Sequence, residues 1–175
     1  SYYFSVLFSI TFLSSCVTKT NNLAWVVSDH YLASEVGVKI IQAGGNAIDA
    51  SVATAFALAV THPQAGNIGG GGFLVLRNSD GFATTIDFRE TAPLAASPTM
   101  FLNSEGKLIK GANHSGLKSV GVPGTVAGLY LAHNKYGLLP WESLLQPAID
   151  LAEKGFPLSQ ALVDWGKVIS KWPED

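Results

Sequence analysis

THPQAGNIGGGGFLVLRNSDGFATTIDFRE, residues 61–90, is the stretch that decides the fold prediction. It contains four successive glycines at residues 69–72, and glycines are kept where side chains would obstruct a close approach or where φ must be positive. An apolar run (73–77), a set of turn residues (78–81) and a β-branched run (83–89) follow. This order predicts a strand, a turn and a second strand, which together make a β-hairpin.

The second strand of this hairpin has one polar and one apolar face. Side chains on a strand point alternately to opposite sides, so every second residue shares a face. One face carries Thr85, Asp87 and Arg89, and the other carries Thr84, Ile86 and Phe88. We expect the apolar face to be buried, which leaves an exposed polar face that ends in a guanidinium group.

Helices are predicted before the hairpin. Residues 32–43 have apolar side chains at helical spacing and stop at Gly44-Gly45, a typical C-terminal signal. Asn46 is the expected N-cap of an alanine-rich helix that runs to residue 60, with Asp49 in its first turn, where the helix dipole favours an acid. The many alanines predict close packing against a neighbouring element. Residues 24–28 are a strand candidate.

More helices are predicted after the hairpin, beyond a long irregular segment. That segment spans residues 91–119, and a loop of such length in a compact domain is often functional. Thr125 is the expected N-cap of the next helix, which Gly137 ends. A further helical stretch is expected to begin at Pro140 and to end at Gly155.

The composition is that of an ordinary folded protein. Of its 175 residues, 47% are apolar and 14% are charged, which excludes a disordered chain. A formal net charge of −2 and a pI near 6.0 provide no basic surface, so nucleic acid is not an expected partner. Cys16 is the single cysteine, which rules out an intramolecular disulfide and a thiolate metal cluster. No metal or cofactor is expected.

The first residues of the chain resemble a bacterial export signal. Residues 4–13 are hydrophobic and uncharged, and are too few to span a bilayer. The tetrapeptide LSSC ending at Cys16 resembles the lipobox, in which signal peptidase cuts before a cysteine that becomes lipid-modified. We therefore expect residues 1–15 to be a truncated lipoprotein-type signal peptide and residues 16–24 to be a lipid-anchored tether. The alternative is a plain secretory signal with an incidental cysteine.

Other candidate site residues have simpler interpretations. His62 lies at the end of a predicted helix, so a capping or packing role fits it better than that of a base. His30, His114 and His133 show no metal-ligand spacing. The glycine run leads into a strand and lacks the Gly-Lys-Ser/Thr of a phosphate site, which excludes a nucleotide site of that type. The chain has no Gly-x-Ser-x-Gly elbow.

Several motifs point together to one family. They are GGNAIDA (44–50), THPQAGN (61–67), GGGGF (69–73), IDFRE (86–90), VPGTVAG (122–128), QPA (146–148), LA (151–152) and GF (155–156). In this order and combination the chain resembles γ-glutamyltransferase, also called glutathione hydrolase. The resemblance runs from about residue 26 to residue 156 and is highly specific.

The resemblance implies an α+β fold, that of an N-terminal-nucleophile hydrolase with four layers in the order α-β-β-α. Residues 25–175 would form the first part of the large subunit. The family precursor cleaves itself, and the nucleophilic threonine becomes the first residue of the small subunit, where its own α-amino group can act as the base. We therefore expect no catalytic residue within this chain and no activity from this chain alone.

Arg89 is the one functional residue that the resemblance assigns. Within IDFRE it matches the family arginine that binds the α-carboxylate of the γ-glutamyl group. A planar guanidinium can donate two parallel hydrogen bonds to a carboxylate, which would hold the γ-carbonyl at a fixed distance for attack. Asp87 and Glu90 are supporting candidates, either as simple ion-pair partners of Arg89 or as groups that orient it for the substrate.

The implied function is γ-glutamyl transfer and hydrolysis on glutathione and other γ-glutamyl compounds. The expected partners are these substrates, amino acid or peptide acceptors or water, the small subunit of the same precursor and, through the lipid, a membrane. The protein would be exported to the bacterial periplasm or outer membrane. The alternatives are a related acylase acting on a cephalosporin or on poly-γ-glutamate, and a non-catalytic ligand-binding lipoprotein.

Overall fold

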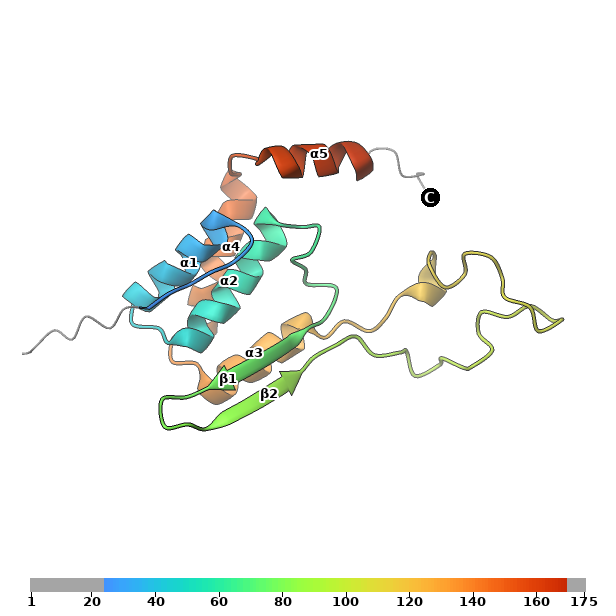
Figure 1. Cartoon of the computed structure of the whole chain (residues 1–175), viewed down its shortest axis with the longest axis horizontal. Coiled ribbons are helices and arrows are strands. Elements are labelled where there is room, and N and C mark those ends of the chain that lie inside the picture. The colour runs from blue at the N-terminus through green and yellow to red at the C-terminus, as the bar shows by residue number, and fades with distance from the viewer. Residues whose placement is uncertain (1–23, 170–175) are drawn as a thin grey trace, which may run out of the picture.

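The computed structural model describes residues 24–169 (Figure 1). Residues 1–15, Cys16 and all but the last residue of the expected tether lie outside this part. The elements are α1 (Tyr31–Gln42), α2 (Ala47–Thr61), β1 (Phe73–Arg77), β2 (Ala83–Asp87), the 3₁₀ helix η1 (Leu117–Ser119), α3 (Thr125–Tyr136), α4 (Trp141–Lys154) and α5 (Gln160–Ile169). No helix in this part of the chain has both the length and the apolar character needed to cross a membrane.

The two glycines after α1 end this helix as predicted. Gly44 has a φ of 96°, in the left-handed region that favours glycine. Its N–H donates to the carbonyl of Ile41, and the N–H of Gly45 donates to the carbonyl of Ile40, each at 3.0 Å. These two bonds are those of a Schellman motif, which satisfies carbonyls that the helix end leaves free. The chain therefore turns directly into α2.

The start of α2 is capped as predicted. Asn46 Oδ1 accepts hydrogen bonds from the N–H groups of Ile48 at 2.9 Å and Asp49 at 3.0 Å. Asp49 Oδ2 in turn accepts from the N–H of Asn46 at 2.9 Å, which completes a capping box. The two side chains together fix the first turn of the helix.

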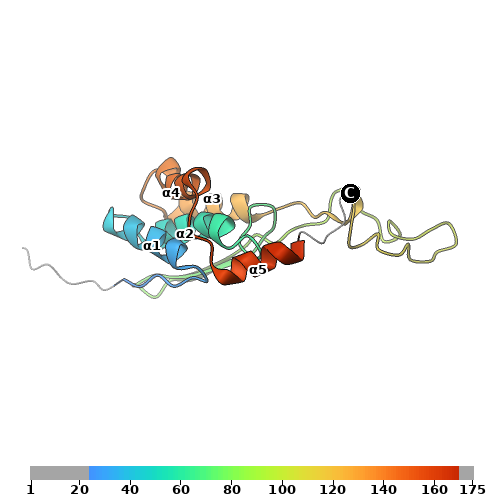
Figure 2. The same ribbon diagram turned by 90° about the horizontal axis from the view of Figure 1, so that it is seen from above.

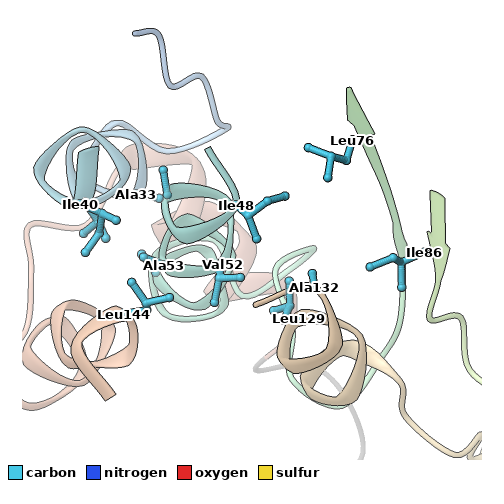
Figure 3. Packing of buried hydrophobic residues seen from close by; sticks show 13 residues of the cluster. Ala33, Ile40, Ile48, Val52, Ala53, Leu76, Ile86, Leu129, Ala132 and Leu144 are labelled. Atoms are coloured by element: carbon cyan, nitrogen blue, oxygen red, sulfur yellow. The ribbon is translucent and has the colours of Figure 1, made fainter. Parts of the chain in front are cut away.

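The hydrophobic core surrounds α2. This helix packs against α1, α3 and α4, and its small residues Val52, Ala53 and Ala57 are completely buried, so the prediction of close packing is confirmed. Figure 3 shows Leu76 and Ile86 pointing from the two strands toward the helices. The helices therefore cover one face of the hairpin.

The hairpin has the predicted strands, turn and faces. β1 and β2 are antiparallel, with Phe73 opposite Asp87 and Arg77 opposite Ala83. Ile86 is buried, whereas Asp87 and Arg89 are exposed, so the apolar face of the second strand is the buried one. This alternation confirms the period-two prediction.

Two details of the secondary structure differ from the prediction. Residues 24–28 are not in a strand, because no strand of the described chain forms hydrogen bonds with them. The helix expected from Thr125 does include this residue, but Gly124 takes the N-cap position. Thr125 is the first helical residue, and its hydroxyl group bonds elsewhere.

Residues 91–119 form the long irregular segment that the sequence predicts. Figures 1 and 2 show it extending well beyond the helices before it returns to α3. Its local order comes from a bridge between Leu102 and Leu108 and from η1. Thr91, at the start of the segment, forms a second bridge with Val122, which lies three residues beyond its end. This bridge lies directly beyond Arg89 and Glu90.

Candidate functional site

Arg89 lies two residues beyond the end of β2, with 66% of its side chain exposed. Its Nε atom is 3.8 Å from Glu90 Oε2, longer than a hydrogen bond. Its Cζ atom is 6.0 Å from the centre of the Phe73 ring. Within residues 24–169, no side chain forms a close hydrogen bond with the guanidinium group. Its donors are therefore open to a ligand.

The two neighbouring carboxylates act differently on Arg89. Asp87 Oδ1 accepts a hydrogen bond from the backbone N–H of Arg89 at 3.0 Å, so this carboxylate fixes the main chain. Glu90 is the carboxylate near the guanidinium, in a loose and exposed pair. A pair of this kind contributes little to stability. It leaves the guanidinium free to exchange Glu90 for another carboxylate.

The glycine loop packs directly against the backbone that carries Arg89. A Cβ atom on Gly71 would lie 2.6 Å from the carbonyl oxygen of Phe88 and 2.8 Å from Arg89 Cα, and one on Gly72 would lie 2.8 Å from the Phe88 ring. None of the four glycines has a positive φ. Of the two predicted reasons for the run, close approach is therefore confirmed and positive φ is wrong.

Helix α3 closes on the same backbone from another direction. A Cβ atom on Gly124 would collide with the carbonyl oxygen of Phe88, and one on Gly128 would collide with the base of the Phe88 side chain. The Gly-x-x-x-Gly spacing within VPGTVAG places both glycines on one helix face, which is a signal that the sequence interpretation missed. Phe88 is thus held between the glycine loop and α3.

Hydrogen bonds join the glycine loop to the start of α3. The carbonyl of Gly70 accepts from the N–H groups of Gly124 at 2.8 Å and Thr125 at 3.1 Å. Asn67 Oδ1 accepts from the N–H of Gly70 and from Thr125 Oγ1, each at 2.8 Å. The expected N-cap threonine therefore forms a contact across 58 positions of sequence.

The remaining candidates do not gather around Arg89. His62 occupies the C-cap position of α2, and its ring Nδ1 lies 2.9 Å from Gln64 Nε2, in agreement with a capping or packing role. His133 Nε2 contacts the carbonyl of Leu139 at 2.7 Å. Among residues 24–169, no three histidine, cysteine, aspartate or glutamate side chains are arranged to bind a metal ion. The group that this part of the site offers to a ligand is therefore the positive charge of Arg89, which suits an anionic ligand group.

Sequence comparison identifies the family. The family model described as Gamma-glutamyltranspeptidase matches residues 33–172, which is most of the chain. The chain belongs to the gamma-glutamyltranspeptidase family. This confirms the resemblance that the motifs indicate, and all of the residues around Arg89 lie inside the matched range.

Known proteins of the gamma-glutamyltranspeptidase family and fold are similar but longer. The glutathione hydrolase proenzyme of Pseudomonas sp. (strain A14) is 54% identical over 139 residues, 79% of this chain and 24% of that protein. The crystal structure of Helicobacter pylori gamma-glutamyltranspeptidase aligns with a TM-score of 0.81 and 47% identity, over 86% of this chain and 43% of that chain. A cephalosporin acylase from Bacillus halodurans aligns with a TM-score of 0.71 and 28% identity, over 97% and 33%.

The comparisons also confirm the predicted fold class. The described chain is a mixture of helices and strands, as an α+β fold requires, and its fold is that of gamma-glutamyltranspeptidase structures. It contains one group of helices on one hairpin, which is only part of the four-layer sandwich. The chain spans about a quarter of the length of the curated relatives it matches.

Proposed function

We propose that this chain supplies the carboxylate-binding part of a γ-glutamyltransferase, which moves the γ-glutamyl group of glutathione and related compounds to amino acids, peptides or water. The observation that carries the proposal is the exposed guanidinium of Arg89 on a backbone held by glycines. Membership of the gamma-glutamyltranspeptidase family supports the reaction class.

Arg89 has a simple chemical task in this proposal. Its guanidinium donates two hydrogen bonds to the α-carboxylate of the glutamyl group, displacing the loose contact with Glu90. Asp87 holds the main chain of Arg89 during this exchange. With its α end fixed, the substrate presents its γ-carbonyl at a constant distance, which lowers the entropic cost of attack.

The nucleophile of the proposed reaction is outside this chain. It is the threonine at the N-terminus of the small subunit, whose α-amino group takes the proton from the hydroxyl. Residues 25–175 then form the first part of the large subunit, and this part alone is expected to be inactive. Measurable turnover by residues 17–175 alone would overturn this assignment.

Export and lipid anchoring form a separate part of the proposal. Residues 1–15 act as the signal, Cys16 receives the lipid and residues 16–24 form the tether, so the enzyme works in the periplasm or at the outer membrane. Several acyl chains on one cysteine give stable anchoring. Labelling with palmitate tests this directly: the label enters the wild-type protein and not Cys16→Ser. An unlabelled wild type overturns the anchor and leaves the proposed activity unaffected.

The Arg89 assignment is tested in the complete protein with γ-glutamyl-p-nitroanilide. Arg89→Lys keeps the charge but loses the paired donors, and we expect KM to rise roughly 10-fold, the effect of losing one charge-assisted hydrogen bond. Arg77→Lys is the matched control, because Arg77 is exposed at the other end of the hairpin. An unchanged KM in Arg89→Lys would refute the assignment.

The acylase alternative rests on the structural likeness to a cephalosporin acylase, which is weaker than the likeness to gamma-glutamyltranspeptidase in both identity and TM-score. Substrate profiling separates the two: γ-glutamyl compounds are expected to be cleaved in preference to cephalosporin side chains and poly-γ-glutamate. The non-catalytic alternative requires that the complete protein lacks the threonine and shows no turnover.

A further inference from the structure

We infer that Asn67 and Thr125 are positioning residues for the carboxylate site, acting through the hydrogen bond that joins their side chains. This bond runs from Thr125 Oγ1 to Asn67 Oδ1 at 2.8 Å. Thr125 is buried, with 7% of its surface exposed, so water competes little with Asn67 for its hydroxyl group. The inference rests on the proposed role of Arg89, because Asn67 and Thr125 act on the substrate only through the position of Arg89.

The contact is one part of a two-way connection, here called the clasp, made by Asn67, Gly70, Gly124 and Thr125. The Asn67 oxygen receives one donor from the glycine loop and one from α3. The Gly70 carbonyl receives the first two N–H groups at the start of α3, those of Gly124 and Thr125. The clasp therefore closes the loop onto α3 with three bonds that cross between them.

The backbone that carries Arg89 lies between the two elements that the clasp joins. Gly71 contacts it from the loop side, and Gly124 contacts the Phe88 carbonyl from the α3 side. The Phe88 N–H also donates to the Gly72 carbonyl at 3.0 Å. If the clasp loosens, the loop and α3 can separate, and the main chain of Phe88 and Arg89 gains freedom. A displacement of about 1 Å at a positioning group is enough to change activity strongly.

The chemistry of the clasp sets a sharp requirement at position 125. A hydroxyl group is needed to donate to Asn67, while the remainder of the side chain only fills space. Thr125→Val keeps the branched shape and removes the donor, whereas Thr125→Ser keeps the donor and removes a methyl group. The two variants therefore separate the hydrogen bond from packing.

The test uses the complete protein and γ-glutamyl-p-nitroanilide. We expect Thr125→Val to raise KM roughly 3- to 10-fold, the range for the loss of one neutral hydrogen bond, with kcat within about 2-fold of wild type. Thr125→Ser is expected to keep KM within about 2-fold. If Thr125→Val does not fold, Asn67→Ala, which truncates an exposed side chain, carries the same prediction. Equal KM values in the valine variant and wild type overturn the inference.

A double variant tests whether the clasp acts through Arg89. In an Arg89→Lys background the guanidinium is absent, so Thr125→Val is expected to change KM by less than about 2-fold. If the KM increases of Arg89→Lys and Thr125→Val multiply in the double variant, the two residues act independently. Thr125 would then have a general structural role, and the inference would be overturned. If Arg89→Lys raises KM and Thr125→Val does not, only the clasp fails. If Arg89→Lys leaves KM unchanged, the proposed function fails, and the inference fails with it.

Discussion

The start of α2 and the end of β2 are both held firmly, but by opposite means. At the start of α2, the buried Asp49 carboxylate accepts from the N–H groups of Asn46 and Leu138, and Asn46 Nδ2 donates to the carbonyl of Tyr136 at 2.6 Å. At the end of β2, glycines press on the backbone of Phe88 and leave the Arg89 side chain exposed. At the start of α2 the side chains themselves form the stabilising hydrogen bonds. At the end of β2 the backbone is fixed by glycine contacts, and the Arg89 side chain makes no close hydrogen bond within residues 24–169.

The proposed function gives a reason for this difference. Guanidinium donors that bind a substrate carboxylate are not available to fix the position of Arg89. Its backbone has to be fixed by other residues, and glycine permits the closest contact between two main chains. The contrast predicts that damage at Asp49 lowers stability alone, whereas damage at the glycines also changes substrate binding.

The largest expected effect is the loss of stability in Asp49→Ala. Asp49 is fully buried, and the substitution removes the carboxylate that accepts from the N–H groups of Asn46 and Leu138. We expect the free energy of unfolding of the complete protein to fall by about 3 kcal/mol. Chemical denaturation measures this change.

Two controls accompany this variant. Asp80→Ala removes an exposed carboxylate that accepts one hydrogen bond, from Phe82, and should cost less than about 1 kcal/mol. The KM of folded Asp49→Ala for γ-glutamyl-p-nitroanilide should stay within about 2-fold of wild type. A much larger rise in KM would show that the two regions are coupled and would contradict the comparison.

The second prediction compares two glycines in the same run. In Gly71→Ala the new methyl group would lie 2.6 Å from the Phe88 carbonyl oxygen and 2.7 Å from the Glu90 nitrogen, both of them backbone atoms that cannot rotate away. We expect a loss of about 2 kcal/mol in stability, typical of overpacking. We also expect a rise in KM of roughly 10-fold, since Arg89 must move.

Gly69→Ala is the matched control for that substitution. Apart from Gly69 and its two chain neighbours, no atom of residues 24–169 lies within 4 Å of a Cβ placed at Gly69, and the φ of Gly69 is not positive. Its stability and KM should equal those of wild type, measured by the same denaturation and kinetic assays. Equal losses in the two variants would mean that the run acts through flexibility and not through close approach.

Comparing the sequence predictions with the structure shows which elements the sequence can predict. The hairpin, the Gly44-Gly45 helix end and the Asn46 cap follow from patterns within a few residues, and all are confirmed. Local spacing determines such elements, because turn geometry and helix caps depend on adjacent residues.

Contacts between distant residues could not be predicted in this way. Leu138 is 89 positions from Asp49, and Thr125 is 58 positions from Asn67, so neither partner is visible in a local pattern. Local reasoning made Thr125 an N-cap, whereas its hydroxyl group bonds to the glycine loop. The strand prediction for residues 24–28 failed for a related reason, because a strand needs a partner and local propensity does not supply one.

The smallest expected effect concerns an exposed contact on α4, away from both regions. Hydrogen bonds from Lys154 and then from Gln146 lower the pKa of Asp150 below its ordinary value of 3.8. A carboxyl with a lowered pKa in the folded state stabilises the protein above its unfolded pKa, and this contribution is lost as the pH falls through the folded pKa. The contribution is small, because the group is exposed to water.

Lys154→Met should therefore raise the pKa of Asp150 toward 3.8, lower the stability at neutral pH only slightly and leave KM unchanged. Gln146→Met is the control, with a smaller rise, because its hydrogen bond is the lesser cause. NMR titration of labelled aspartate carboxyl groups measures both. A change in KM in either variant would mean that surface contacts on α4 reach Arg89. The comparison between the start of α2, where side chains stabilise the fold, and the end of β2, where glycine contacts leave Arg89 exposed, would then not be enough to explain the site.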